Sequence, residues 1–323
     1  MKAIVQDEYG SADVLRFEDI PVPVPGDNEV LLRVEAASAH IGDWHLMMGT
    51  PYAIRLGYGL RRPKLRVRGM DVAGRVEAVG KDVTEFQPGD EVFGTCKGSL
   101  AEYAVARPDK IALRPSNLTF EQAATVPISG IAALQGLRAS GKAQPGQTVL
   151  IVGAAGAVGT FAVQLAKALG TEVTGVCSTS KLDLVRSIGA DHVIDYTRED
   201  FTVSGRRYDL ILDLAGRRPV SALRRALSPR GTLVIVGGEG GGRWFGGVMG
   251  RLLHVLLLSP FVRQKLRPLA SKERKKDLLA LKELIEAGKV TPVIGRTYTL
   301  SEAPDALGHL GGGHATGKAV ITV

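Results

Sequence analysis

The sequence predicts an α/β protein of two domains, a β-barrel domain and a domain built on a doubly wound parallel sheet. The chain has 323 residues, which is long for a single compact core. Residues 1–110 contain short segments rich in β-branched side chains and separated by turns. From Thr148 onward, short apolar strands alternate with helices, which is typical of a parallel sheet with helices on both faces.

The barrel domain is predicted from its strands and turns. Residues 30–34 and 72–79 form β-branched-rich strands, and residues 88–90 (Pro-Gly-Asp) form a turn. Thr119 then caps a helix, with Gln122 at the reciprocal capping position.

The second domain is predicted from alternation and from glycines that end its helices. Its strands are residues 148–152, 172–176, 192–194, 208–213 and 232–236, and its helices are residues 160–169, 181–188 and 220–227. An amphipathic helix over residues 275–287 follows, and residues 289–323 are again strand-like. We therefore expect a catalytic domain over residues 1–122, completed by residues 290–323, and a nucleotide-binding domain over residues 123–289.

Composition excludes several classes of protein. Hydrophobic residues make up 45% and charged residues 23%, as in soluble globular proteins. The two cysteines, Cys96 and Cys177, are too few for a disulfide framework or an all-thiolate metal site. The sequence shows no secretion signal at Met1 and no apolar stretch of about 20 residues. These features predict a soluble, cytoplasmic protein.

The net charge of +8 equals the local balance of residues 243–276, so the rest of the chain sums to zero although it contains a second basic run. Residues 243–276 hold nine Lys or Arg against the single acid Glu273, and residues 61–68 form a second basic run. Such clusters can contact nucleic acid or anionic lipid, face solvent, or attract an anionic cofactor. Because no aromatic-rich binding motif accompanies them, we do not expect nucleic acid as a partner.

The strongest local signal is a glycine-rich loop between a predicted strand and a predicted helix. Its residues are Gly153, Ala154, Ala155, Gly156, Ala157, Val158 and Gly159. Gly153 permits a tight turn, Gly156 lets a diphosphate approach the backbone, and Gly159 allows close packing of helix and strand. The helix N-terminus then offers N–H groups to the phosphates. The alternative is a glycine-rich turn without a ligand.

The end of the next strand decides which dinucleotide is expected. An NAD site usually has an acid there. This chain has the hydroxyl residues Ser178, Thr179 and Ser180, followed by Lys181. Hydroxyls and a lysine attract the 2′-phosphate of NADP(H), so NADPH is the predicted cofactor. The alternative is that Ser178 and Ser180 only turn the chain and that Lys181 only starts a helix. We also place Gly237, which follows the strand over residues 232–236, among the cofactor-binding residues.

Four motifs in this order resemble the medium-chain dehydrogenase/reductase superfamily, in its zinc-independent quinone oxidoreductase branch. They are residues 36–44 (Ala-Ala-Ser-Ala-His-Ile-Gly-Asp-Trp), 69–74 (Gly-Met-Asp-Val-Ala-Gly), 88–92 (Pro-Gly-Asp-Glu-Val) and the glycine loop. The resemblance covers nearly the whole chain. It implies a GroES-like catalytic domain, a Rossmann domain, a cofactor in the cleft between them, and a homodimer or homotetramer.

The resemblance also predicts that no metal is bound. Zinc-dependent relatives carry a cysteine where His40 stands and a Gly-His-Glu triplet where this chain has Gly69-Met70-Asp71. The third ligand position falls near Ile128, and Met70 and Ile128 cannot bind a catalytic zinc. The close spacing of His40, Asp43 and His45 leaves a metal site as an alternative, although pocket lining or ordinary hydrogen bonding is favoured.

Without zinc, an ordinary ketone loses its main electrophile, whereas a quinone or enone delocalises the developing charge. We therefore predict NADPH-driven reduction of quinones or α,β-unsaturated carbonyls, with His40, Asp43 and Tyr52 as candidate catalytic groups. By resemblance, Tyr196 lies near the adenosine, and Thr316 stands where relatives place a basic residue. Two alternatives stay open: an NADP-dependent alcohol dehydrogenase lacking zinc, and a non-enzymatic, NADPH-loaded RNA-binding protein.

Residues 240–276 form an unusual apolar and basic insertion, with a continuous apolar run over residues 252–262. The run is too short to span a bilayer. We expect a lid over the substrate site or a subunit contact; a helix lying on a membrane surface and a core segment are the alternatives.

Overall fold

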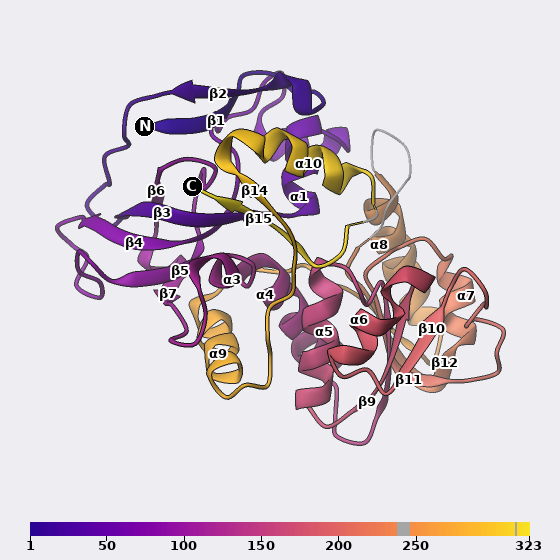
Figure 1. Cartoon of the computed structure of the whole chain (residues 1–323). Helices are drawn as coiled ribbons and strands as arrows, with labels where there is room; N and C mark the ends of the chain where they lie inside the picture. The colour runs from indigo at the N-terminus through magenta and orange to yellow at the C-terminus, as the bar shows by residue number, and fades with distance from the viewer. Residues whose placement is uncertain (238–245, 314) are drawn as a thin grey trace. The chain divides into compact units, whose positions relative to one another are not determined.

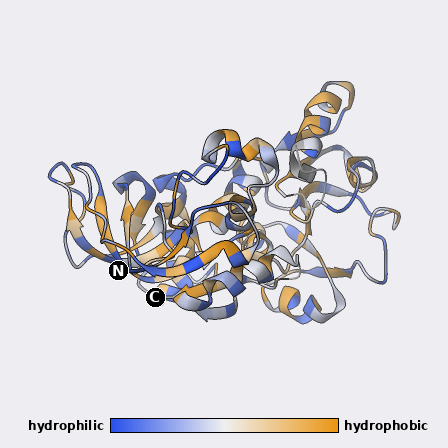
Figure 2. Ribbon diagram, turned by 90° about the horizontal axis from the view of Figure 1, so that it is seen from above, coloured by the Kyte–Doolittle hydropathy of each residue, from blue (hydrophilic) through white to orange (hydrophobic). Residues whose placement is uncertain are grey.

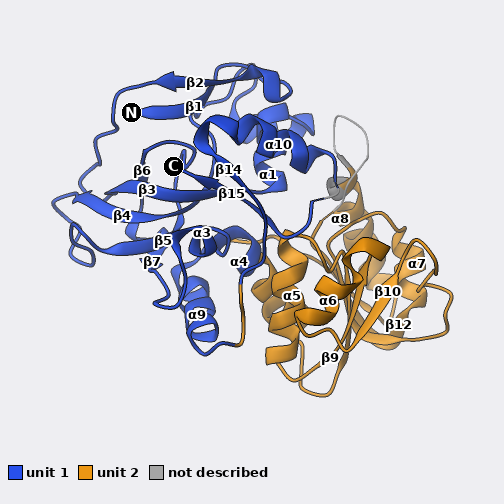
Figure 3. Cartoon of the chain, in the orientation of Figure 1, with its two compact units in different colours: residues 1–131, 273–288, 292–323 blue, residues 132–272, 289–291 orange. Residues whose placement is uncertain are grey.

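The computed structural model describes residues 1–237, 246–313 and 315–323 (Figure 1). Residues 240–245 of the predicted insertion, and His314, lie outside the described residues. The chain divides into two compact units (Figure 3): unit 1 comprises residues 1–131, 273–288 and 292–323, and unit 2 comprises residues 132–272 and 289–291. Residues 123–131 and 273–288, which the sequence assigned to the nucleotide-binding domain, thus lie in unit 1.

Helix α9 (Lys275–Glu286) belongs to unit 1 because its contacts are there. It packs against β7 (Ile111–Leu113), and Asn117 Nδ2 donates to the Ile285 carbonyl oxygen at 2.8 Å. Lys275 Nζ lies 2.6 Å from Glu85. Of the four residues predicted on the apolar face of the helix, Leu278, Leu281 and Ile285 are buried and Leu284 is half-buried. The helix directly follows the main segment of unit 2 in the sequence, so its position did not indicate that it would pack against unit 1.

Unit 1 is built on a seven-stranded sheet with a separate two-stranded sheet, β1–β2. The large sheet has the order β14-β15-β3-β4-β5-β7, and β6 pairs with β3. The strands are β1 (Lys2–Gln6), β2 (Leu15–Asp19), β3 (Val30–Ala39), β4 (Asp71–Val79), β5 (Glu91–Thr95), β6 (Tyr103–Ala106), β7, β14 (Ile294–Thr299) and β15 (Lys318–Thr322). The GroES-like β-domain is confirmed, and its C-terminal strand β15 runs antiparallel to β3.

The helices of this part of the chain connect or cap the strands. Besides α9, they are α1 (Ile41–Met48), α2 (Arg55–Tyr58), α3 (Phe120–Ala124) and α10 (Ala303–Gly311), together with the first part of α4 (Pro127–Gln135), whose residues 132–135 belong to unit 2. The predicted capping box of α3 is present: Gln122 N donates to Thr119 Oγ1 at 3.3 Å, and Thr119 N donates to Gln122 Oε1 at 3.1 Å.

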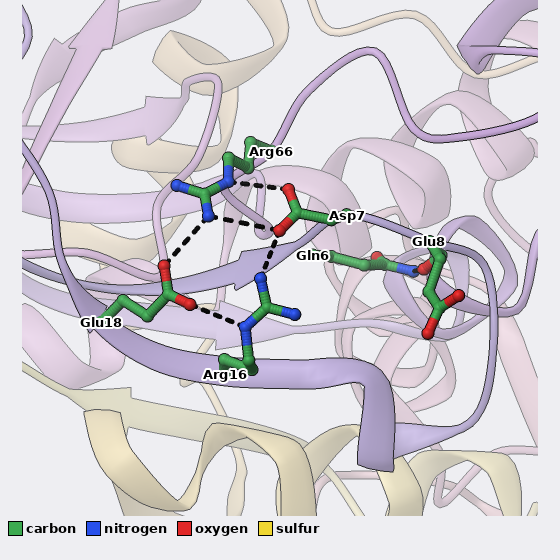
Figure 4. Close-up of polar contacts among 6 residues, drawn as sticks. All are labelled: Gln6, Asp7, Glu8, Arg16, Glu18 and Arg66. Carbon is green, nitrogen blue, oxygen red and sulfur yellow. Dashed lines mark hydrogen bonds and ion pairs between the residues drawn. The ribbon is translucent and has the colours of Figure 1, made fainter.

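A network of exposed ion pairs covers the two-stranded sheet (Figure 4). Arg66 donates to Asp7 at 2.7 Å and to Glu18 at 3.0 Å, and Arg16 donates to Glu18 at 2.6 Å and to Asp7. Hydrogen bonds from Arg66 and then Arg16 lower the pKa of Asp7 to about 2. One arginine of the basic run over residues 61–68 is thus paired with acids, which weakens that run as a surface for nucleic acid.

Unit 2 contains a six-stranded parallel sheet in the order β10-β9-β8-β11-β12-β13. Its strands are β8 (Thr148–Val152), β9 (Glu172–Cys177), β10 (His192–Asp195), β11 (Tyr208–Asp213), β12 (Leu227–Ile235) and β13 (Lys265–Pro268), and its helices are α5 (Ala157–Ala168), α6 (Leu182–Ser187), α7 (Val220–Arg225) and α8 (Gly246–Leu258). Chain order runs outward in both directions from β8, so right-handed crossovers place the helices on both faces. The predicted doubly wound Rossmann domain is confirmed.

The core of unit 2 lies on its apolar strands, where Leu150, Ile211 and Leu233 are fully buried. Figure 2 colours hydrophobic residues of the chain orange. The sequence missed β13, which lies inside the segment assigned to the insertion and pairs with β12. Among the described residues, no helix is long and apolar enough to cross a membrane.

Candidate functional site

The loop after β8 has the geometry of a diphosphate-binding turn. Gly153 lies in the left-handed region with φ of +91°. Gly156 is the N-cap of α5, which begins at Ala157 rather than at the predicted residue 160. Because the first amides of a helix have no partner within the helix, the N–H groups of Ala157, Val158 and Gly159 are available to an anion.

The glycines of this loop have different surroundings. A Cβ at Gly159 would lie 2.1 Å from the Gly153 carbonyl oxygen, so the packing of loop and helix requires glycine there. A Cβ at Gly156 would meet only that oxygen, at 3.5 Å, which leaves open space beyond the loop. This open approach to the backbone fits the diphosphate of a dinucleotide.

Ala154 and Ala155 support the loop from inside. Both side chains are buried, and the Ala154 N–H donates to the Val176 carbonyl oxygen at 3.0 Å. The Gly153 N–H donates to the same oxygen at 3.1 Å. These bonds attach the loop to β9, so the Ala154 amide is engaged within the protein.

Ser178 and Lys181 lie together at the end of β9. Ser178 is the N-cap of the short 3-10 helix η5 (Thr179–Lys181). Burial lowers the pKa of Lys181; Cys177 acts in the opposite direction, and the positive charge of Arg217 lowers it further. Arg217 follows β11 in the chain, and sequence reasoning missed it, although the Arg217-Arg218 pair after a predicted strand was a visible signal.

A carboxylate also lies beside this turn, contrary to the sequence-based expectation that no acid is available. Asp195 ends β10 and is in register with Cys177 at the end of β9. Its oxygens accept from the hydroxyl groups of Thr179 and Thr197 and from the Thr197 N–H. The Thr179 hydrogen bond holds the pKa of Asp195 below its usual range, assisted by Thr197. The acid comes from the neighbouring strand, which a pattern confined to β9 cannot reveal.

Tyr196 and Gly237 lie at the same edge of the sheet. Tyr196 is 40% exposed, and its N–H donates to the Cys177 carbonyl oxygen at 3.1 Å. A Cβ at Gly237 would lie 2.1 Å from the Leu214 carbonyl oxygen, so the close approach of two loops explains this glycine. The structure therefore brings Tyr196, Gly237, Ser178 and the loop after β8 to the carboxyl ends of the parallel strands, where open sheets bind ligands.

A buried ion pair joins this edge to α8. Asp213, at the end of β11, is fully buried; it pairs with Arg251 and accepts from the Gly216 N–H at 3.1 Å. Arg251 also donates to the Arg218 carbonyl oxygen. Burial raises the pKa of Asp213, and the Arg251 charge opposes that rise. The pair fixes α8 against the loop that carries Arg217.

In unit 1, the structure brings two predicted catalytic residues together. His40 is the N-cap of α1, and its N–H donates to Asp43 Oδ2 at 3.0 Å. His40 Nε2 lies 3.4 Å from the same oxygen and is buried without a hydrogen bond in the described structure. Burial raises the pKa of Asp43, and the His40 ring and peptide N–H oppose that rise.

A second buried carboxylate, Asp71, lies within electrostatic range of Asp43. It accepts from Lys318 Nζ at 2.8 Å, from Ser38 Oγ at 3.0 Å and from the Ile128 N–H at 2.9 Å. The side chains of Asp71 and Lys318 are both fully buried. Sequence reasoning missed Lys318, which lies 247 residues from its partner.

This donor set does not fit a zinc ion. Both oxygens of Asp71 are engaged by hydrogen-bond donors, and His45 Nδ1 lies 2.9 Å from the Thr50 carbonyl oxygen. In the part of the chain that the structure describes, no three His, Cys, Asp or Glu side chains gather as possible metal ligands. The alternative trio of His40, Asp43 and His45 is thus not assembled as a metal centre.

Tyr52, the third predicted catalytic residue, packs against a cation. The Arg55 guanidinium lies 4.6 Å from the Tyr52 ring centroid and 4.4 Å from that of Tyr9. Arg55 Nε also donates to the Gly49 carbonyl oxygen at 2.8 Å. Tyr52 therefore contacts Arg55, whereas His40 contacts Asp43, so the described contacts do not join Tyr52 to the other two predicted catalytic residues.

Neither cysteine has the environment of a nucleophile. Burial raises the pKa of Cys177 to about 11, and Asp195 contributes to the rise. Burial also raises the pKa of Cys96. Both thiols therefore stay protonated near neutral pH.

Comparison with known proteins agrees with this architecture. Residues 26–116 match the alcohol dehydrogenase GroES-like domain family, and residues 188–321 match the zinc-binding dehydrogenase family. The chain is 34% identical to a chloroplastic quinone oxidoreductase of Triphysaria versicolor, over 99% of this chain and 98% of that protein. It is 33% identical to a chloroplastic NADPH-dependent alkenal/one oxidoreductase of Arabidopsis thaliana, over 99% of this chain and 79% of that protein.

Among solved structures, the quinone oxidoreductase of Coxiella burnetii matches with a TM-score of 0.86 and 30% identity. The match covers 100% of this chain and 99% of that one. The similarity therefore extends over both units.

Proposed function

Because the chain belongs to the medium-chain dehydrogenase/reductase superfamily, in its quinone oxidoreductase-like branch, we propose that it reduces quinones or α,β-unsaturated carbonyl compounds with NADPH and without zinc. The observation that carries the proposal is the loop after β8. There Gly156 leaves open space in front of the unpaired amides of Ala157, Val158 and Gly159. The names of the two plant relatives support the acceptor class.

The preference for NADPH is supported by charge at the end of β9. Lys181 and Arg217 lie close enough for their positive charges to interact, and two neighbouring cations attract a phosphate. Asp195 favours NADH in principle, but its oxygens already accept hydrogen bonds from Thr179 and Thr197. Ser178 offers a further hydroxyl at the same turn.

Bound NADPH would supply the hydride, so the protein has to bind, orient and protonate. The helix amides would donate hydrogen bonds to the diphosphate, and Lys181 with Ser178 would hold the 2′-phosphate. His40 Nε2, buried beside Asp43, is the proposed group for orienting or protonating the reduced acceptor. Both oxygens of Asp71 accept hydrogen bonds, and the described residues offer no group of zinc ligands, which favours an acceptor that delocalises its own negative charge.

Two glycine variants test the cofactor loop. Gly156→Ala places a methyl group in the open space, so we expect an unchanged melting temperature and a Kd for NADPH about tenfold higher or more. Gly159→Ala forces a methyl group against the Gly153 oxygen and should lower stability as well as affinity. Fluorescence titration and thermal unfolding measure both. An unchanged Kd in Gly156→Ala, with the fold intact, contradicts the site.

Lys181→Ala tests the choice of dinucleotide. Loss of a charged hydrogen bond of about 1.5–3 kcal/mol should weaken NADPH binding about 10- to 100-fold and leave NADH binding nearly unchanged. Equal weakening of both, or tighter binding of NADH by the unmodified protein, would reverse the assignment.

Activity is tested by NADPH oxidation with a panel of quinones and enones, beside NADP reduction with alcohols. Turnover confined to alcohols would favour the alcohol dehydrogenase alternative, and salt-sensitive RNA binding without turnover would favour the non-enzymatic one. A homodimer or homotetramer in the cytoplasm belongs to the same proposal, and light scattering of the purified protein tests the oligomer.

A further inference from the structure

Helix α8 carries apolar residues on both of its faces. On the inner face, Val255 is fully buried, and Leu252 and Leu258 pack against the core of unit 2. The outer face carries leucines that are more than half exposed, namely Leu253, Leu256 and Leu257. A helix that only packed on its own sheet would have polar residues on that outer face.

The apolar surface continues beyond the helix. The 3-10 turn η6 (Ser259–Phe261) follows α8 directly, and the Phe261 side chain is 84% exposed. Leu253, Leu257 and Phe261 are spaced four residues apart, so they follow one stripe along α8 and its continuation. We call Leu253, Leu256, Leu257 and Phe261 the apolar stripe.

A basic groove adjoins the end of this stripe. It has a volume of about 530 Å³ and is lined by Arg207, Ser221, Arg224, Arg225, Pro229, Phe261, Val262, Arg263 and Gln264. Arg224 donates to the neutral Gln264 side chain at 2.9 Å, and Arg207 donates to the Leu227 carbonyl oxygen at 3.0 Å. Among the described residues, no ion pair joins the four groove arginines to an acid, although the Arg225 charge helps to lower the pKa of Asp200. The groove therefore keeps an excess of positive charge.

We propose that the apolar stripe and the basic groove together dock on the surface of an anionic lipid bilayer. Phe261 belongs to both features, so apolar insertion and phosphate binding would occur at one place. The free energy of the system falls when leucine and phenylalanine side chains enter the boundary between head groups and acyl chains. Arginines beside them bind lipid phosphates bidentately, and each basic residue adds to the attraction of a negative surface.

The charge of the groove distinguishes this partner from two others. A second copy of the chain, paired face to face, would bring two sets of arginines together, and like charges oppose that contact. A nucleic acid would satisfy the arginines but would leave the leucines exposed, since its backbone offers them no apolar partner. An anionic bilayer satisfies both halves of the surface.

The docking is independent of turnover, but its consequence rests on the proposed function. A reductase held at the bilayer would reach quinones or enones that are dissolved in the lipid. Vesicle binding needs no substrate, so failure of the docking and failure of the reductase activity are separately visible.

The test is flotation of the full chain with phosphatidylcholine vesicles, with and without phosphatidylglycerol. We expect flotation only with phosphatidylglycerol, and weaker flotation at high salt. Arg225→Gln with Arg263→Gln should weaken binding about tenfold or more, since each basic residue contributes about fivefold. Leu256→Ser with Leu257→Ser should weaken it about tenfold at constant charge.

Matched controls lie elsewhere on the surface. Lys81→Gln with Lys289→Gln removes the same charge, and Val24→Ser removes an exposed apolar side chain; both should float like the unmodified protein. The proposal is overturned if no vesicle binds, or if the controls weaken binding as much as the test variants. It is also overturned if the leucine variant changes only oligomer size, if the arginine variant changes only RNA binding, or if inorganic phosphate binds the groove while vesicles do not.

Discussion

In both units, a fully buried carboxylate pairs with a cation that is distant in sequence, but the surroundings of the two pairs differ. Asp71 and Lys318 both lie on strands of one sheet, and both side chains are fully buried. Asp213 ends a strand, whereas Arg251 comes from α8 and is 14% exposed. Asp71 also accepts from Ser38 and Ile128, while Arg251 Nε is buried without a partner in the described structure.

The difference separates a pair that holds a fold together from a pair that attaches one element to it. Losing Lys318 alone would leave the charge of Asp71 buried at the start of β4, within electrostatic range of Asp43. Losing Asp213–Arg251 would free α8 and the loop after β11, leaving the other strands of the unit 2 sheet paired as before. The first pair should therefore control global stability, and the second should control the outer helix and the cofactor edge.

The largest effect is expected for Lys318→Met. The substitution leaves Asp71 buried without its cation, which costs about 3–5 kcal/mol when a buried pair is broken. Urea unfolding at neutral pH measures the loss. The double variant Asp71→Asn with Lys318→Met removes both charges and should recover much of the stability; a single variant as stable as the unmodified protein would contradict the comparison.

A smaller effect, with a characteristic pH dependence, is expected for Arg251→Met. Loss of its charged hydrogen bonds should cost about 1.5–3 kcal/mol at neutral pH. Burial already raises the pKa of Asp213, and removing Arg251 raises it further. Folding then favours the protonated acid, so the penalty is small at acid pH and grows as the pH rises above the unfolded pKa.

Thermal unfolding of Arg251→Met between pH 4 and pH 8 measures this dependence, with Asp213→Asn as the matched control. The control lacks the titrating carboxyl, so its stability should change less with pH. A penalty that grows toward acid pH would show that Asp213 is not the group responsible.

The smallest effect is expected in the exposed network of Figure 4. Asp7→Asn removes hydrogen bonds from Arg66 and Arg16, but these side chains are about half exposed and solvent screens them. Because the pKa of Asp7 is lowered from 3.8 to about 2, its contribution is present above pH 3.8 and is lost as the pH falls toward 2. Melting temperatures at low and high salt should differ little between variant and parent above pH 5. A loss of stability as large as that of Arg251→Met would contradict the prediction that exposed pairs contribute less than buried pairs.

The sequence by itself determined the features that depend on neighbouring residues. The strand, glycine loop and helix from Thr148 to Ala168 were predicted because turn, helix start and close packing are properties of a contiguous segment. The capping box of α3 and the apolar face of α9 were predicted for the same reason. The unsuitable residues at the zinc-ligand positions were visible because the motif order fixes which position is which.

Only the tertiary structure decided how distant segments meet. Strand order brought Asp195 beside the end of β9, and the order β15-β3-β4 brought Lys318 to Asp71. Two segments lie elsewhere than the sequence predicted, because their local patterns fit either unit. Helix α9 packs on unit 1, and β13 pairs with β12. The sequence shows where a charged residue or an apolar face occurs, but only the folded structure shows which group pairs with it. Many residues distant in sequence are chemically equivalent as partners until the sheets are assembled.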